Sequence, residues 1–236
     1  MHREILLCLL IVLGFNSCKN EQVITFSEVE KTTDTNTIVE INVPEASGNL
    51  LISNTINSEI ESYICKLLSQ NDEASISTLD AQIDAFNRSY KDFTTDFPNS
   101  SQQWEAQIDG EVIYKSSEII SIALTAYINT GGAHGSTTIS FLNFESATGN
   151  LIPNTKLFNT IEAFKNVAQP YFKEATRDKS LLLESKTFEL PANIGYSDEG
   201  IILLYNVFEI APYSEGIIEF TIPYSEVNDY LIFNGL

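Results

Sequence analysis

The stretch Trp104-Glu-Ala-Gln-Ile-Asp-Gly-Glu-Val-Ile-Tyr114 decides the fold of this chain, because its residues alternate between two faces. Apolar or small residues occupy every second position, among them Ala106 and Ile108. Such alternation is typical of a β-strand with one buried face. Asp109-Gly110 would ordinarily indicate a hairpin turn, but the alternation continues through it unbroken. We therefore predict one long strand, with the turn later, at Lys115-Ser-Ser-Glu118.

Two further alternating segments follow, separated by glycine-containing turns. Alternate apolar residues from Ile120 to Ile128 predict a strand, and a second strand returns from Thr138 to Phe144. The turn between them is Thr130-Gly-Gly-Ala-His-Gly135, and Ala147-Thr-Gly-Asn150 forms another. Consecutive strands joined by short turns favour a meander.

One strand and two helices precede this sheet. The segment from Thr37 to Val43 alternates and is followed by Pro44, which should end the strand. Isoleucines at helical spacing predict a helix over residues 50–69. A second helix should begin near Ser77, because this residue and Asp80 resemble a capping box.

The remaining third of the chain combines one long helix with short strands. Apolar spacing from Ile161 to Ala175 predicts a third helix, which Pro170 should kink or divide. Strands are expected at residues 188–190, 201–210 and 216–222, and a short helix at 225–232. About three helices packed on an antiparallel, meander-like sheet make an α+β protein.

The N-terminus has the features of a bacterial export signal. An apolar run from Ile5 to Leu13 leads to Gly14-Phe-Asn-Ser-Cys18. The run is about half the roughly 20 residues of a membrane-spanning helix. We predict a signal peptide over residues 1–17, acylation of Cys18 and a lipid-anchored protein of the cell envelope. Lys19 is not the aspartate of an inner-membrane retention signal, so we expect the outer membrane; an ordinary secreted protein is the alternative.

Charge narrows the range of partners. Residues 18–36 are polar and threonine-rich, so we expect a flexible tether there. The net charge is −19, and it does not change when Arg3 and Glu4 leave together with the signal. Such a chain repels nucleic acid and anionic lipid and attracts a cationic partner. The alternative is that the charge serves only to keep an exported protein soluble.

The sequence shows no recognisable catalytic or metal-binding constellation. His2 leaves with the signal, so a zinc site would have to combine His134 with carboxylates alone. There is no Gly-x-Ser-x-Gly elbow and no Walker loop. We therefore expect neither an enzyme nor a cofactor. Cys65 is the one cysteine left besides Cys18, and its apolar helical surroundings predict a buried, inert thiol.

Two turns are candidates for ligand contact. Gly131 and Gly132 can expose backbone N–H groups, and His134 offers a donor and an acceptor beside them. The alternative is a tight hairpin with a structural histidine. Tyr213 and Glu215 lie in a second turn, where a ring and an acid could contact a sugar or a basic protein. Here the alternative is a corner in which the ring packs and the acid is solvated.

These motifs also carry a family resemblance. The Gly-Gly-Ala-His turn, Phe144 to Gly149, and Tyr205-x-x-Phe-Glu-Ile-Ala-Pro-Tyr213-x-x-Gly216 resemble the C-terminal domain of RsiV-type anti-sigma factors. The segment from Thr37 through the Trp104 strand resembles the accessory domain of PdaC-type peptidoglycan deacetylases. We therefore expect a PdaC-like domain over residues 37–130 and an RsiV-like domain over residues 131–236.

The resemblance implies an extracytoplasmic binding role, because RsiV-type domains bind lysozyme. The partner that it implies is a basic lysozyme-like muramidase, and the alternatives are a peptidoglycan- or glycan-binding module and a cell-wall-modifying enzyme. The sequence shows neither the transmembrane helix of RsiV nor the catalytic domain of the deacetylases. Signalling across a membrane and deacetylation are therefore not carried over.

Replacement of Cys18 tests the anchor. Because the thiol is the acylation site, Cys18→Ala should leave an unprocessed or mislocalised protein. Metabolic labelling with a fatty acid, followed by membrane fractionation, measures this. A wild-type protein that is processed normally but takes up no acyl label contradicts the assignment.

Overall fold

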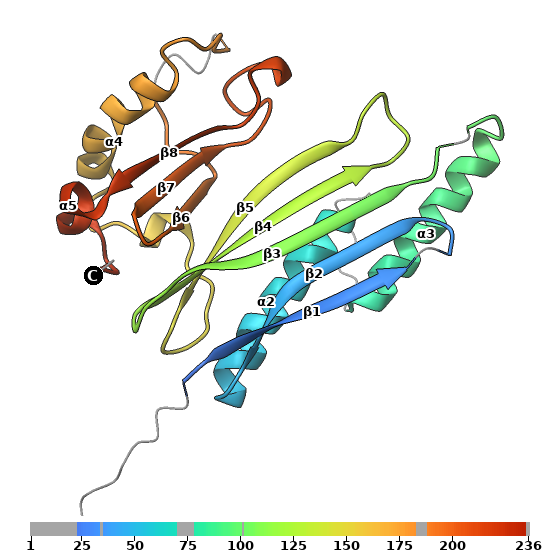
Figure 1. Cartoon of the computed structure of the whole chain (residues 1–236), viewed down its shortest axis with the longest axis horizontal. Helices are drawn as coiled ribbons and strands as arrows, with labels where there is room; N and C mark the ends of the chain where they lie inside the picture. Colours follow the sequence, from blue (N-terminus) through green and yellow to red (C-terminus); the bar gives the residue numbers. More distant parts are fainter. Residues whose placement is uncertain (1–22, 34, 70–77, 101, 183–187, 235–236) are drawn as a thin grey trace, which may run out of the picture.

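The computed structural model describes residues 23–33, 35–69, 78–100, 102–182 and 188–234, which form two packed α+β units (Figure 1). The first holds a five-stranded sheet of order β1-β2-β3-β4-β5, and the second a three-stranded sheet of order β6-β7-β8. The α+β class is thus confirmed. All strand pairs are antiparallel except β2 and β3, which are parallel. In the described part of the chain, no helix is long and apolar enough to cross a bilayer.

The first sheet confirms the long strand that the alternation predicts. Its strands are β1 (Thr25–Thr33), β2 (Ile38–Ser47), β3 (Glu105–Lys115), β4 (Ile119–Asn129) and β5 (Ser136–Glu145). β3 runs straight through Gly110, and a Cβ there would lie 2.7 Å from the Pro44 ring and 2.9 Å from Leu124 Cδ2. Glycine therefore serves close packing and not a turn. The prediction that Pro44 ends its strand is wrong, because β2 continues to Ser47. Pro44 lies beyond Asn42, the last residue paired with β3, so its missing N–H costs no bond to that strand.

Two helices connect the parallel strands β2 and β3 and cover one face of the sheet (Figure 1). They are α2 (Leu50–Leu68) and α3 (Leu79–Asp96). A parallel pair needs such a crossover, because a short turn can join only antiparallel strands. The isoleucine stripe of α2 is buried in one core together with the inward side chains of β2, β3 and β4.

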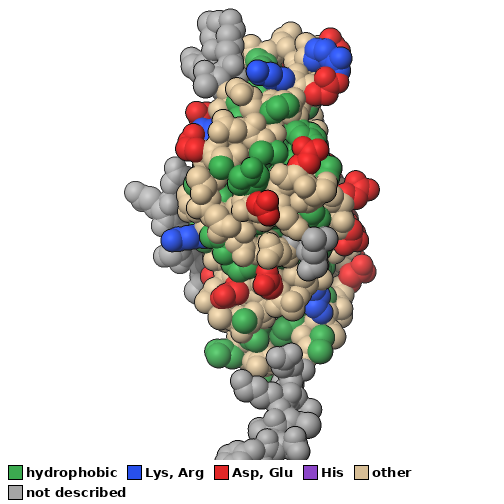
Figure 2. Space-filling model, turned by 90° about the vertical axis from the view of Figure 1, so that its left-hand side faces the viewer, with side chains coloured by type: hydrophobic (Ala, Val, Ile, Leu, Met, Phe, Trp, Pro, Cys, Tyr) green, Lys and Arg blue, Asp and Glu red, His purple; other side chains and the backbone are tan. Residues whose placement is uncertain are grey.

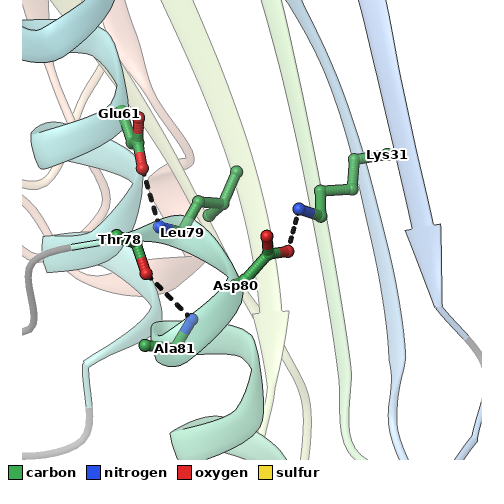
Figure 3. A network of polar contacts seen from close by, with 6 residues as sticks. All are labelled: Lys31, Glu61, Thr78, Leu79, Asp80 and Ala81. Carbon is green, nitrogen blue, oxygen red and sulfur yellow. Dashed lines mark hydrogen bonds and ion pairs between the residues drawn. The ribbon is translucent and has the colours of Figure 1, made fainter.

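The start of α3 is held by side chains from its own cap and from α2 (Figure 3). The cap is Thr78, whose Oγ1 accepts from the Ala81 N–H at 3.3 Å. Glu61 of α2 accepts from the Leu79 N–H at 2.7 Å. The expected cap was Ser77, which lies outside the described residues; the helix uses the next hydroxyl residue instead.

Part of the predicted tether is a β-strand. β1 pairs with β2 along its whole length, and Lys31 forms an ion pair with Asp80 at the start of α3 (Figure 3). The tether prediction for residues 18–36 is therefore wrong for residues 25–33, while residues 18–22 and Asp34 lie outside the description. The pattern misled because β1 is an edge strand whose side chains are mostly exposed, so it shows no clear alternation.

The second unit is built around α4 (Ile161–Ala175), which continues through Pro170 without being divided. Its strands are β6 (Asn193–Tyr196), β7 (Gly200–Tyr205) and β8 (Ile218–Pro223), followed by the short helix α5 (Tyr224–Val227). Two strand predictions are wrong, because residues 188–190 form no strand and β7 ends at Tyr205. Phe208 has φ +66°, which an extended strand cannot accommodate.

β5 belongs to the first sheet, although it follows the domain boundary expected at residue 130. It pairs with β4 from Ile119↔Glu145 to Ile128↔Ser136. The inner face of this pair packs in the first core, and its outer face meets the second unit.

A buried hydrogen-bond network joins the two units. Ser121 of β4 donates to Asn143 Oδ1 of β5 at 2.8 Å, and its Oγ accepts from the Tyr196 N–H at 3.1 Å. Asn143 Nδ2 donates to the Ile194 carbonyl at 2.7 Å. Asn143 is only 1% exposed, so water cannot replace these bonds. The network therefore fixes β6 against the outer face of the first sheet.

Asn143→Ala should lower the free energy of unfolding by about 2–4 kcal/mol, because the buried Ser121 hydroxyl loses its acceptor and the Ile194 carbonyl loses the donor side chain of Asn143. Chemical denaturation measures the change. Asn154→Ala is the matched control, since its amide donates to the Ala192 carbonyl at an exposed site and should cost about 0.5 kcal/mol. Equal losses in the two variants contradict the importance of burial.

Candidate functional site

The two candidate turns lie at the end of the molecule opposite the start of the described chain (Figure 1). Lys115, at the end of β3, donates to the Ile24 carbonyl, so the chain enters beside the β3–β4 turn. The turn at residues 130–135 lies at the other end of β4, which has 11 residues. At about 3.4 Å per residue, the two ends are roughly 35 Å apart.

The structure brings His134 and Tyr213 together. Their rings stack with centroids 4.7 Å apart and planes inclined by 27°. His134 comes from the β4–β5 turn and Tyr213 from the loop between β7 and β8, so each unit supplies one ring. His134 Nδ1 lies 3.0 Å from the Gly135 carbonyl. A carbonyl can only accept, so Nδ1 carries the proton, and Nε2 is the acceptor of the neutral ring.

The two glycines of the first turn have different environments. Gly131 has φ +84°, and a Cβ there would lie 3.2 Å from Trp104 Nε1 and 3.3 Å from Phe93 Cζ. Its role in holding the turn against these rings is structural. Gly132 is exposed, and a Cβ there would meet only the His134 carbonyl oxygen, at 3.7 Å. The backbone at Gly132 is therefore accessible to a ligand.

Glu215 interacts within the second unit. Its Oε1 accepts from the Ser180 N–H at 3.1 Å, and its Oε2 lies 3.8 Å from Lys179 Nζ. Lys179 also donates to the Glu215 carbonyl at 2.8 Å. The carboxylate thus holds the β7–β8 loop against the segment that follows α4, while its side chain stays 21% exposed.

Phe208 is a site residue that the sequence did not single out. Its ring centroid lies 5.6 Å from that of Tyr213, and the side chain is 62% exposed. In the sequence, Phe208 appeared only as one residue of the family motif. No sequence signal marks its positive φ, because that conformation is set by the loop around it.

The other tyrosine of this motif is part of the core. Tyr205 is 2% exposed, and its hydroxyl donates to the Glu189 carbonyl at 2.6 Å. Burial raises the pKa of Tyr205. It is therefore not available as a stacking platform for a sugar, and Tyr213 is the exposed ring of the pair.

Carboxylates line the outer face of the first sheet, away from α2 and α3. Glu28, Glu30, Glu40 and Asp109 surround a hollow of about 550 Å³. Within the described residues, none of the four forms an ion pair with Lys, Arg or His. Figure 2 shows a further side of the molecule, where acidic side chains lie scattered among apolar and uncharged ones.

The described residues hold no cluster of three or more His, Cys, Asp or Glu side chains suited to a metal ion. Cys65 is buried, as predicted, and burial, together with the nearby Glu61, raises the pKa of its thiol. A raised pKa lowers the thiolate fraction, so this cysteine is a poor nucleophile.

Comparison with solved structures shows the same fold in two proteins. One is a DUF3298 family protein from Pseudomonas aeruginosa PAO1, 17% identical, with a TM-score of 0.61 over 91% of this chain and 96% of that one. The other is a DUF3298 family member from Bacteroides fragilis NCTC 9343, 18% identical, with a TM-score of 0.62 over 91% of this chain and 95% of that one. A search of curated proteins finds no match.

Two family models match the chain, and together they span both units. The model described as Deacetylase PdaC matches residues 30–137. The model described as Protein of unknown function (DUF3298) matches residues 151–225. The chain therefore carries a PdaC domain followed by a DUF3298 domain, in agreement with the resemblance of its motifs.

Proposed function

We propose that this protein is an extracytoplasmic binding module, held to the cell envelope by lipid on Cys18, that captures a cationic protein such as a lysozyme-like muramidase. The observation that carries the proposal is the stack of His134 on Tyr213. This stack joins the two candidate turns into one surface at the end of the molecule away from the chain entry.

Charge supports a cationic partner. A net charge of −19 produces a long-range field that accelerates encounter with a basic protein at low salt. The unpaired carboxylates on the outer face of the first sheet add to this field close to the surface. The contacts at the two turns would then determine affinity, because a few central residues usually dominate binding.

The position of the turns fits an anchored receptor. The lipid on Cys18 would hold the chain entry near the membrane, only a few residues from β1. The His134–Tyr213 surface would then face away from the bilayer, about 35 Å from the entry end of the sheet. A partner diffusing in the envelope could reach it without approaching the lipid.

Removal of either ring tests the proposal. His134→Ala and Tyr213→Ala should each weaken muramidase capture by about 1–3 kcal/mol if the ring is a central contact. Thermal melts should remain close to wild type, since neither side chain is buried. Capture of purified muramidases by the full chain in detergent, at increasing salt, gives the affinities. Protein capture should weaken as salt rises, whereas stacking on neutral sugars should not.

Early melting of both variants would assign the two turns to the scaffold. Unchanged capture by both would place the contact surface elsewhere. Binding to purified peptidoglycan that does not respond to salt would favour the alternative of a glycan-binding module.

We also expect no hydrolase activity on peptidoglycan, acetylated glycans or simple esters. The sequence lacks a recognisable nucleophile with its base, and His134 stacks on a tyrosine instead of contacting a hydroxyl nucleophile. Assays with and without added divalent metals measure this. Metal-dependent turnover that His134→Ala abolishes would make the protein an enzyme and overturn the expectation.

A further inference from the structure

We propose that the contact surface is an aromatic edge built by both domains, formed by Phe97, His134, Phe208 and Tyr213, and that it binds Lys and Arg side chains of a cationic protein. The inference rests on the proposed function. It adds Phe97, which neither the motifs nor the candidate turns indicated, and Phe208, which appeared only as one residue of the family motif. Phe97 extends the part of the PdaC domain in binding beyond His134.

Exposure singles out these rings. Among the large hydrophobic residues that the structure describes as exposed, the aromatic ones are Phe97, Phe208 and Tyr213, at 59%, 62% and 44%. One exposed ring needs no explanation. Phe97 comes from the end of α3, and Phe208 and Tyr213 come from the β7–β8 loop. Contacts nevertheless link both groups to the β4–β5 turn, the first through Phe93 and the second through His134. Grouped exposed apolar side chains are typical of an interaction surface.

Contacts link Phe97, the part of the edge that follows α3, to the β4–β5 turn. The ring of Phe97 lies 5.1 Å from that of Phe93, between centroids. Phe93 in turn packs beneath Gly131, where a Cβ would come within 3.3 Å of Phe93 Cζ. The turn that begins at Gly131 carries His134 three residues later. Phe97 and His134 are therefore connected through one supported turn, at the end of the sheet where β4 and β5 join.

The DUF3298 end of the edge continues from His134. Tyr213 stacks on His134 at 4.7 Å, and Phe208 lies 5.6 Å beyond Tyr213. Phe208 occupies the left-handed region, with φ +66°, and it is the one described residue other than glycine with a positive φ. A bulky side chain is disfavoured there. The contact with Tyr213 leaves the Phe208 ring 62% exposed, so a disfavoured backbone conformation is kept without burial of the side chain, as is expected where a ring contacts a partner.

The chemistry of the edge fits a cationic protein. The face of an aromatic ring attracts Lys and Arg side chains, and a chain of charge −19 draws such a partner toward it. Beside Phe97, the exposed Asp96 lines a hollow of about 390 Å³ together with Pro98 and Asn99. A carboxylate beside an exposed ring can pair with the charge of a lysine or arginine whose methylene stem packs on the ring.

The test uses Phe97→Ser and Phe208→Asn in the full chain, purified in detergent, with egg-white lysozyme as the probe. Each variant should bind lysozyme about tenfold more weakly or worse. Asparagine tolerates positive φ better than phenylalanine, so Phe208→Asn should keep or raise the melting temperature while it loses binding. Leu51→Ser is the control, because Leu51 is 77% exposed at the start of α2, by the chain entry, and should leave binding unchanged.

A second probe tests the contact with cationic side chains directly. Polylysine presents lysine side chains without a folded surface, so both variants should bind it more weakly than wild type, although by less than their loss toward lysozyme. Polylysine binding that both variants keep at the wild-type level, while lysozyme binding is lost, would overturn the aromatic edge as a site for Lys and Arg side chains. So would lysozyme binding by both variants at the wild-type affinity, although wild-type capture would then still support the proposed function.

Two further outcomes test the proposed function and the kind of ligand. A wild-type chain that binds no lysozyme would overturn the proposed function, and with it the partner assigned to the edge. Retention on purified peptidoglycan that both variants lose, with lysozyme binding intact, would assign the edge to a glycan and overturn the cationic protein.

Discussion

The hydrogen bond between Ser121 and Asn143 is the interaction on which the arrangement of this protein depends. The two side chains face each other across β4 and β5, on the side away from α2 and α3. Through them the first sheet holds the Ile194 carbonyl and the Tyr196 N–H of β6. An apolar pair at these positions could pack, but it would leave both backbone groups unpaired in a buried site. The polar pair therefore fixes where β6 lies along the outer face.

The position of β6 then determines where the second unit can reach. Asn206, just beyond β7, accepts from the Ile139 N–H and donates to the Ile139 carbonyl, at 2.9 and 2.8 Å, so it occupies part of the edge of β5. The loop that follows carries Phe208 and Tyr213 to the β4–β5 turn. The proposed contact surface thus lies where the two units meet, and each unit supplies some of its rings. Such a surface depends on the domain interface as much as on its own residues.

The sequence anticipated the first domain better than the second. Alternation identified β3 as one strand through Gly110, and isoleucine spacing identified α2, because both elements bury one regular face in a single core. The same periodicity missed β1, because this edge strand has mostly exposed side chains. It also placed the end of β7 too late, because apolar residues continue in the sequence after the strand ends at Tyr205. Periodicity reports burial, so it is silent where a strand is exposed and misleading where a loop is apolar.

For the candidate site, the sequence by itself determined the net charge and the two turns that carry His134 and Tyr213. It also showed no recognisable motif of catalytic residues. These features depend only on composition and on local motifs. Only the tertiary structure decided that those rings stack, that Glu215 pairs with Lys179, and that Phe97 and Phe208 are each linked through a neighbouring ring to the β4–β5 turn. The physical reason is distance along the chain. Residues 134 and 213 are brought together by sheet register and by the Ser121–Asn143 network, and neither leaves a local pattern from which the contact could be inferred.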